Sequence, residues 1–401
     1  MGLSSENEAL LEKAIAKIGP PNILLQNENG KIENISDLSF EDDREIEGKE
    51  EKNERQTCKR VVQVSLLLGA LPLLFVFVLL PLLIYFCPHV MQNLFFLNFR
   101  KIPMTDYENV SANNVKSTGR SFYLQGEQGK IGVWHMWPRS LSARYHDKNI
   151  IPTGEEMEES LSKEVYPVVL YAHGNSFDRT IDHRCQLYNV LNDMNYQVIA
   201  FDYRGYGDSE GTPTEEGLVA DSRLVFEYLR KKVGKNLLII WGHSMGTGVS
   251  TKLVQDLSKE SKAPDGLILE SPFNNLHDAV MNHPFSFPIR WMPDTLVNLL
   301  ILNPLRSVGL NMNSDQRIVD ITCPIFIIHA EDDHVIPAKL GRLLRDAAKQ
   351  AERDVEYLEF PSNRQFKHKF IYLADELPTH VRTFFAKCDK LRHGNNSQRL
   401  D

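Results

Sequence analysis

LLIIWGHSMGTG (Leu237–Gly248) combines a short apolar run with a serine that lies between two glycines. Leu237–Ile240 is typical of a buried strand, because the run is too short to form a helix of its own. From Thr247 onward the apolar residues have helical spacing. A strand, a G-x-S-x-G motif and a helix in this order predict a strained turn that exposes the hydroxyl of Ser244 above a sheet. An ordinary strand–helix turn is the alternative. Motifs elsewhere in the chain are needed to distinguish the two.

Length and composition fit one large α/β domain with an appendage, or two smaller domains: the chain has 401 residues, of which 42% are hydrophobic and 24% charged. The net charge of −8 argues against nucleic acid as a partner, because domains that bind nucleic acid carry basic patches. Five cysteines are scattered without the spacing of a zinc site. We therefore expect no metal ion, no disulfide framework and no cofactor.

From residue 120 onward, apolar runs alternate with helical patterns, which predicts an α/β fold with a mostly parallel sheet covered by helices on both faces. The expected strands are Ile131–Trp137, Val168–Tyr171, Val198–Phe201, Leu237–Ile240, Leu267–Leu269, Ile325–Ile328 and Val355–Phe360. The expected helices are Thr180–Asn195, Glu215–Lys232, Thr247–Ser258, Lys339–Ala351 and Glu376–Lys387. A polar, acidic insertion at Tyr145–Glu164 is expected to be a surface loop.

Val61–Phe86 contains no charged residue, and it is long enough to span a bilayer. Pro72 and Pro81 would break a soluble helix, but membrane helices tolerate proline. A cleaved signal peptide would be shorter and closer to residue 1, and no globular segment flanks the run to make it a core helix. We therefore predict a single transmembrane helix at residues 61–86.

Basic residues are unequal on the two sides of this span. Lys and Arg recur between residues 44 and 60, whereas only Arg100 and Lys101 follow the span closely. The positive-inside rule then predicts a cytosolic N-terminus, with the large C-terminal part in the lumen or outside the cell. Asn109 begins an Asn-Val-Ser glycosylation acceptor on the correct side. Cys58 is either palmitoylated or a free thiol.

The expected organisation has five parts. Residues 1–60 are rich in Glu, Asp, Asn and Lys and are expected to form a mostly disordered tail. Residues 87–119 connect the span to a domain at 120–388, and 389–401 form a C-terminal tail. Within the connector, His89–Phe99 is too apolar for a linker, so it is expected either to lie in the membrane interface or to pack beneath the domain.

A serine nucleophile needs a base, and the base needs an acidic residue to orient it. In an open sheet these partners follow the carboxyl ends of later strands. HAEDDHVIP (His329–Pro337) follows one strand and supplies acidic residues, and His368 precedes the last helix. The order Ser, Asp, His is that of the α/β-hydrolases, so Ser244 and His368 are the expected nucleophile and base.

Acyl transfer also needs two backbone N–H groups that face the developing negative charge. Met245, directly after the serine, supplies one, and Asn175, after His173-Gly174, is the candidate for the second. His173 is expected to brace this loop. The histidines that lack the position of a base are His243, His277, His283, His329, His334 and His380.

Several motifs together resemble the α/β-hydrolase-domain serine hydrolases, and in particular the α/β-hydrolase domain-containing protein 12 family: HGN, DYRGYGDSEGTP, GHSMGTG, ILESPF, HAEDDHVIP and HKFIY. The resemblance runs from the membrane span to about residue 388. It implies Ser244 as nucleophile, Asp333 as acid and His368 as base. It also implies a single-pass endoplasmic-reticulum membrane enzyme, with a lumenal active site, that hydrolyses lysophosphatidylserine and monoacylglycerols. HGNSFDRT departs from the family pattern, which has a glycine shortly after HGN.

The insertion at residues 274–322 is unusually apolar for a surface excursion. We expect a lid close to the bilayer in which Phe285, Phe287 and Trp291 contact the acyl chain of a lipid substrate. A packed cap without a substrate role is the alternative.

These motifs predict a membrane-anchored serine hydrolase that cleaves the acyl ester of lysophospholipids and monoacylglycerols through an acyl-enzyme intermediate. Thioesters or peptides are alternative substrates, because the same nucleophile attacks any activated acyl group. A non-catalytic scaffold on the hydrolase fold is the remaining alternative.

Overall fold

The computed structural model describes residues 24–26, 32–89 and 95–397. The chain divides into two compact units, Met1–Phe75 and Val76–Asp401. In the first unit, β1 (Leu24–Gln26) pairs antiparallel with β2 (Ile32–Asn34), and helix α2 (Ile35–Leu74) follows. The rest of the predicted tail before residue 32 lies outside the described residues.

Helix α2 differs from the prediction, because residues 35–60 were expected to be mostly disordered and here they are helical. Glu, Lys and Arg have high helix propensity. Ion pairs one turn apart, such as Glu51 and Arg55 at 2.9 Å, also stabilise an exposed helix. A charge-rich composition is therefore compatible with a solvated helix as well as with disorder.

In the described part of the chain, one helix, Glu51–Phe86, is long and apolar enough to cross a membrane by its length and composition. Pro72 lies within α2, and a π-helical turn, η1 (Phe75–Leu79), precedes α3 (Leu80–Phe86). Pro81 lies in the first turn of α3, where its missing N–H costs little. The predicted span at residues 61–86 falls within this helix.

The second unit is built on an eight-stranded sheet with the order β10-β9-β8-β7-β5-β6-β4-β3. Its strands are β3 (Gly119–Gly126), β4 (Gly129–Met136), β5 (Val168–Ala172), β6 (Gln197–Phe201), β7 (Leu238–His243), β8 (Gly266–Glu270), β9 (Ile325–Ala330) and β10 (Val355–Phe360). The β3–β4 and β4–β6 pairs are antiparallel and the others are parallel. The predicted strands are all present. The pattern misses β3, whose half-buried residues alternate weakly.

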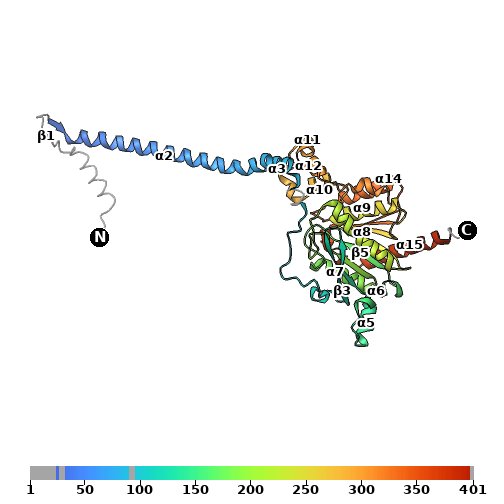
Figure 1. The fold of residues 1–401 in the computed structure, drawn as a ribbon. Helices are drawn as coiled ribbons and strands as arrows, with labels where there is room; N and C mark the ends of the chain where they lie inside the picture. The colour runs from blue at the N-terminus through green and yellow to red at the C-terminus, as the bar shows by residue number, and fades with distance from the viewer. Residues whose placement is uncertain (1–23, 27–31, 90–94, 398–401) are drawn as a thin grey trace, which may run out of the picture. The chain divides into compact units, whose positions relative to one another are not determined.

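Helices cover both faces of this sheet, as predicted. They are α5 (Arg139–Asp147), α6 (Gly154–Lys163), α7 (Asp182–Asp193), α8 (Glu215–Lys232), α9 (Met245–Lys259), α14 (Ala338–Gln350) and α15 (Leu377–Ser397). The apolar residues of α8, α9 and α14 pack on one face, and those of α7 and α15 pack on the other (Figure 1). Short 3₁₀ turns lie at η2 (Val110–Asn113), η5 (Ser362–Arg364) and η6 (Ile371–Leu373).

The prediction of a surface loop at Tyr145–Glu164 is wrong, because this insertion contains the end of α5 and all of α6. Helix α6 begins with a capping box, in which the Thr153 side chain accepts from the Glu156 N–H and the Glu156 side chain accepts from the Thr153 N–H. The T-x-x-E spacing was a readable signal for this helix start.

The insertion between β8 and β9 forms a layer of short helices. They are α10 (Leu276–Asn282), η3 (Pro284–Ile289), α11 (Asp294–Val297), η4 (Asn298–Leu302), α12 (Asn303–Ser307) and α13 (Ser314–Ile318). Val297 and Leu302 are fully buried in the core that includes α9. Helix α3 lies beside α12 (Figure 1) and also contacts η4. Its Pro81 and Ile84 are buried. The end of the predicted membrane span therefore packs against the predicted lid.

Candidate active site

Ser244 occupies a strained turn between β7 and α9. Its backbone has φ 53° and ψ −120°, a conformation that costs a non-glycine residue on the order of 1–3 kcal/mol. Glycines on either side permit the turn. A Cβ on Gly246 would lie 2.1 Å from the Ala172 carbonyl oxygen, and one on Gly242 would lie 2.6 Å from that of Gly246. The turn predicted from G-x-S-x-G is therefore present, and it presents the serine at the carboxyl edge of the sheet.

The structure brings the three residues of the predicted triad together. His368 Nε2 lies 2.9 Å from Ser244 Oγ, and His368 Nδ1 lies 2.7 Å from Asp333 Oδ2. The serine follows β7, the aspartate follows β9 and the histidine follows β10, so three separate loops meet at one edge of the sheet. A base within hydrogen-bond distance of a hydroxyl, and itself held by a carboxylate, is the geometry of nucleophilic acyl transfer.

Asp333 is held as a carboxylate by its surroundings. Its Oδ1 accepts hydrogen bonds from the N–H groups of Val335 and Ile336, both at 2.9 Å. Although burial raises the pKa of Asp333, the charge of His368 and hydrogen bonds from His329 and His368 outweigh it and hold the pKa well below its usual range. The carboxylate can therefore orient the Nδ1–H of His368 at any physiological pH.

The other acidic and histidine residues of this turn have different partners. Asp332 Oδ1 accepts from the Lys367 N–H at 3.0 Å, one residue before the predicted base. His329 Nε2 donates to the Ile336 carbonyl at 2.8 Å, and His334 is exposed. None of these three side chains hydrogen-bonds Ser244 or the ring of His368 in the described part of the chain.

The two predicted N–H donors also lie beside the serine. Helix α9 begins at Met245, so its N–H has no partner within the helix. A Cβ on Gly174 would lie 3.2 Å from the Ser244 Cβ, so the Gly174–Asn175 peptide passes close to the nucleophile. Among the described residues, the Asn175 N–H donates to no acceptor. Both groups are thus available to an oxyanion.

The side chain of Asn175 ties this loop to the connector, which the sequence did not indicate. Its Nδ2 donates to the Phe95 carbonyl at 2.6 Å, and its Oδ1 accepts from the Leu97 N–H at 3.0 Å and from the Tyr206 hydroxyl at 2.8 Å. Phe96 is fully buried in the domain core. Of the two expectations for this apolar run, packing against the domain holds for Phe95 and Phe96. Leu94 lies outside the described residues.

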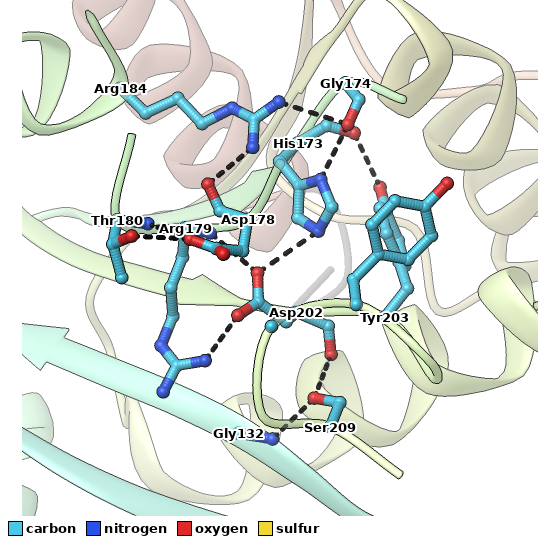
Figure 2. Close-up of polar contacts among 12 residues, drawn as sticks. Gly132, His173, Gly174, Asp178, Arg179, Thr180, Arg184, Asp202, Tyr203 and Ser209 are labelled. Atoms are coloured by element: carbon cyan, nitrogen blue, oxygen red, sulfur yellow. Dashed lines mark hydrogen bonds and ion pairs between the residues drawn. The ribbon is translucent and has the colours of Figure 1, made fainter. Parts of the chain in front are cut away.

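A buried polar network lies behind the same loop (Figure 2). His173 Nδ1 donates to the Gly174 carbonyl at 2.7 Å, and its Nε2 lies 3.3 Å from Asp202 Oδ1. Burial, reinforced by the charge of Arg184, lowers the pKa of His173 well below its usual range. Burial raises the pKa of Asp202 to about 7 despite its ion pair with Arg179. His173 thus contacts the loop as a neutral side chain, in the position expected for bracing it.

The departure from the family's HGN pattern has a structural counterpart at Phe177. Its φ is 61°, in the left-handed region that favours glycine. The guanidinium of Arg100 lies 5.5 Å from the centroid of the Phe177 ring, and such a cation–π contact offsets part of the strain. The loop therefore adopts a left-handed turn at Phe177 without a glycine.

The predicted lid residues are largely on the surface. Phe287 and Trp291 are 62% and 78% exposed, whereas the Phe285 side chain lies outside the described part of the structure. His283, just before them, has its pKa lowered by burial and by the charge of His368. Asn109 is exposed, and its Oδ1 accepts from the Ser111 hydroxyl at 2.8 Å.

Within the described residues, no group of three or more His, Cys, Asp and Glu side chains is arranged to hold a metal ion. The described site consists of a serine, a histidine, a carboxylate and backbone N–H groups, which suffice for acyl transfer.

Comparison with known proteins agrees with this geometry. Residues 163–319 match the family model described as serine aminopeptidase, S33. Lysophosphatidylserine lipase ABHD12 of Danio rerio is 39% identical over 318 residues, which are 78% of this chain and 81% of that protein. The same enzyme of Bos taurus is 40% identical over 78% of each chain. Protein ABHD12B of Homo sapiens is 34% identical over 67% of this chain and 72% of its own length.

Solved structures share the fold. An α/β hydrolase of Vibrio vulnificus superposes with a TM-score of 0.55 at 18% identity, covering 74% of this chain and 93% of that one. Fold, motifs and relatives therefore agree: the chain is a serine hydrolase and belongs to the α/β-hydrolase domain-containing protein 12 family.

Proposed function

We propose that the protein is a membrane-anchored lysophospholipase that hydrolyses the acyl ester of lysophosphatidylserine and, less selectively, of monoacylglycerols. The observation that carries this proposal is the hydrogen-bonded series Ser244–His368–Asp333 in a chain whose relatives are named lysophosphatidylserine lipases.

The geometry supports a two-step acyl transfer as the proposed reaction. Ser244 Oγ attacks the ester carbonyl while His368 Nε2 takes its proton, and Asp333 stabilises the imidazolium through Nδ1. The oxyanion accepts from the N–H groups of Met245 and Asn175. His368 then gives the proton to the departing alcohol oxygen of the lysolipid, which leaves the acyl group on Ser244. Water, activated by the same histidine, releases the fatty acid and restores the serine.

A bilayer supplies the substrate in this proposal. Exposed apolar side chains are found both on the lid and on the part of α3 that packs against it. They are Phe287, Trp291, Leu296 and Leu299 of the lid and Leu82, Leu83, Tyr85 and Phe86 of α3. A surface of this kind on a water-soluble face would be costly, whereas in a membrane interface it would be solvated by acyl chains. The lid would then admit single-chain lipids directly from the membrane.

The topology is part of the same proposal. Residues 61–86 would anchor the enzyme in the endoplasmic-reticulum membrane, with residues 1–60 cytosolic and the catalytic domain in the lumen. Protease added to sealed microsomes is then expected to remove only the N-terminal tail, and a glycosidase to reduce the mass through Asn109. A catalytic domain digested in intact vesicles would contradict this orientation.

The decisive test of function compares lysophosphatidylserine, other lysophospholipids, monoacylglycerols and acyl-thioesters as substrates of the full-length protein in membranes. Release of fatty acid from lysophosphatidylserine, lost in Ser244→Ala together with labelling by a fluorophosphonate, is the expected result. Faster turnover of thioesters than of any ester would replace the proposed substrate class. Labelling that persists in Ser244→Ala would remove Ser244 as nucleophile.

A further inference from the structure

Arg184, in α7, is a buried arginine whose guanidinium donates hydrogen bonds to three backbone carbonyl groups. It is 2% exposed. Its Nη1 donates to the Asp178 carbonyl at 2.5 Å, and its Nη2 donates to those of Gly174 and Ser176 at 3.1 and 2.8 Å. All three carbonyls belong to the loop after β5 that contains Asn175, as Figure 2 shows for Gly174 and Asp178. The side chain thus fixes the backbone of the predicted oxyanion loop from behind.

This arrangement leaves a charge unpaired. Buried charges are normally neutralised by a carboxylate, because desolvation is costly. Arg179 follows this rule with Asp202, and Arg204 follows it with Asp221 at 2.7 Å. Arg184 forms no ion pair with any residue that the structure describes. Together with burial, its charge lowers the pKa of His183 and of Lys369, so the positive field extends to the loop that carries the base.

The direction of the Gly174–Asn175 peptide connects this charge to the reaction. A peptide bond is planar, and in its trans form C=O and N–H point in opposite directions. With the Gly174 carbonyl directed at Arg184 and at His173, the Asn175 N–H is directed away from them. A cation at the carbonyl end also polarises the peptide and strengthens the N–H as a donor. The positive charge of Arg184 therefore acts on the predicted site through the polarised Asn175 N–H.

We propose that Arg184 is a positioning residue for ester hydrolysis, which holds the Asn175 N–H toward the oxyanion and provides a buried positive charge that is balanced only when the oxyanion forms. The substrate ester is neutral at the reacting carbonyl, whereas the tetrahedral intermediate carries a full negative charge there. An interaction that strengthens between these two states raises kcat and leaves KM largely unchanged. The proposal depends on Ser244 and Asn175 acting as described under Proposed function, whichever ester is the natural substrate.

The test uses the full-length enzyme in detergent micelles with three measurements on Arg184→Gln and Arg184→Lys. These are kcat and KM for a long-chain ester, the affinity for an alkyl trifluoromethyl ketone, and the affinity for an ether analogue of the lysolipid. The ketone forms an oxyanion on Ser244, and the ether cannot. Arg184→Gln is expected to lower kcat about 100-fold and to lower the affinity for the ketone by a similar factor. The affinity for the ether analogue is expected to stay unchanged. Arg184→Lys keeps the charge but loses the planar fork, so a loss of about 10-fold is expected.

Arg204→Gln is the matched control, since it also removes a buried arginine but one that is paired with Asp221 on α8. It is expected to lower the midpoint of thermal unfolding while kcat and ketone affinity stay at the wild-type values. Unchanged ketone affinity in either Arg184 variant, or equal losses of ketone and ether affinity, would overturn the proposal. If Arg184→Gln does not fold, Arg184→Lys decides on the same criteria. A wild-type enzyme that ignores lysophosphatidylserine but forms the ketone adduct would refute only the proposed substrate.

Discussion

The imidazole of His243 donates a hydrogen bond from Nε2 to the backbone carbonyl oxygen of His368 at 3.0 Å. Consecutive residues at the end of β7 therefore supply the predicted nucleophile and a support for its base. Burial and the charge of His368 lower the pKa of His243 well below its usual range, so this ring stays neutral and donates only from Nε2. This hydrogen bond holds the loop that carries the predicted base.

Replacing His243 by Phe removes that donor while keeping a ring of similar size. We expect kcat to fall roughly 5-fold with little change in KM, because one net hydrogen bond contributes about 1 kcal/mol. His243→Gln, which keeps a donor, should recover part of the loss. His334→Gln is the control, because His334 is exposed. Wild-type rates in His243→Phe would show that the His368 loop needs no such support.

Asp333 and Asp332 provide a discriminating pair. Asp333→Asn should reduce ester hydrolysis by on the order of 10³–10⁴-fold, since an amide cannot stabilise the imidazolium of His368. Asp332→Asn retains an oxygen that can accept from the Lys367 N–H, so its loss should stay below about 10-fold. Initial rates and fluorophosphonate labelling measure both. The opposite ranking of the two variants would mean that Asp332 is the acid.

The side chain of Asn175 can be removed without touching its N–H. Asn175→Ala breaks the contacts with Phe95 and Leu97, which should loosen the loop and lower kcat by roughly 10-fold. Asn98→Ala is the control from the same connector, because Asn98 Nδ2 donates to the Gly205 carbonyl at 3.2 Å and not to the loop after β5. Equal effects of the two substitutions would indicate general destabilisation and not a specific role of Asn175.

Glu270 should make the free energy of unfolding depend on pH. Burial, with a smaller contribution from the charge of Asp333, raises its pKa from the usual 4.5 to about 7 in spite of a hydrogen bond from Trp241. The folded protein therefore binds the Glu270 proton more tightly than the unfolded chain does. The resulting contribution to the free energy of unfolding is complete below about pH 4.5 and is lost as the pH rises to 7. In Glu270→Gln that loss disappears, and the variant should gain roughly 3 kcal/mol over the wild type across this range. Urea unfolding between pH 4.5 and 7.5 measures it, and parallel curves would contradict the assignment.

The exposed lid residues should matter most for long acyl chains. Each CH₂ moved from water into an apolar environment contributes about 0.8 kcal/mol, so a lid that delivers chains from the membrane gives steep dependence on chain length. Phe287→Ser with Trp291→Ser should reduce turnover of long-chain lysolipids more than that of short soluble esters. Ile151→Ser with Val165→Ser is the control, since both are 91% exposed and lie outside the lid. Equal losses on both substrates would favour a structural cap.

The sequence predicted Ser244 and His368 because both follow strands whose apolar runs are clear, and because G-x-S-x-G has a local structural meaning. The strand pattern placed the acid within His329–Pro337, and the family resemblance selected Asp333. The sequence also predicted Met245 and Asn175 as N–H donors from their positions after Ser244 and His173-Gly174. The sequence did not indicate contacts between distant segments. The Asn175–Phe95 bond joins residues 80 positions apart, and nothing in either segment signals the other. No sequence pattern indicated the buried position of Arg184 either, since a single arginine in an amphipathic helix normally faces solvent.

The packing of Pro81 and Ile84 against the predicted lid determines what cleavage of the chain next to the predicted span would do. A protease that cleaves the chain just after Phe86 would release a fragment without these two side chains and would expose the apolar surface of η4 and α12 against which α3 packs. The compact unit that holds the active site begins at Val76, ten residues earlier in the chain. Cleavage after Phe86 would therefore remove part of the unit that holds the predicted active site, so a loss of stability and of activity is expected together.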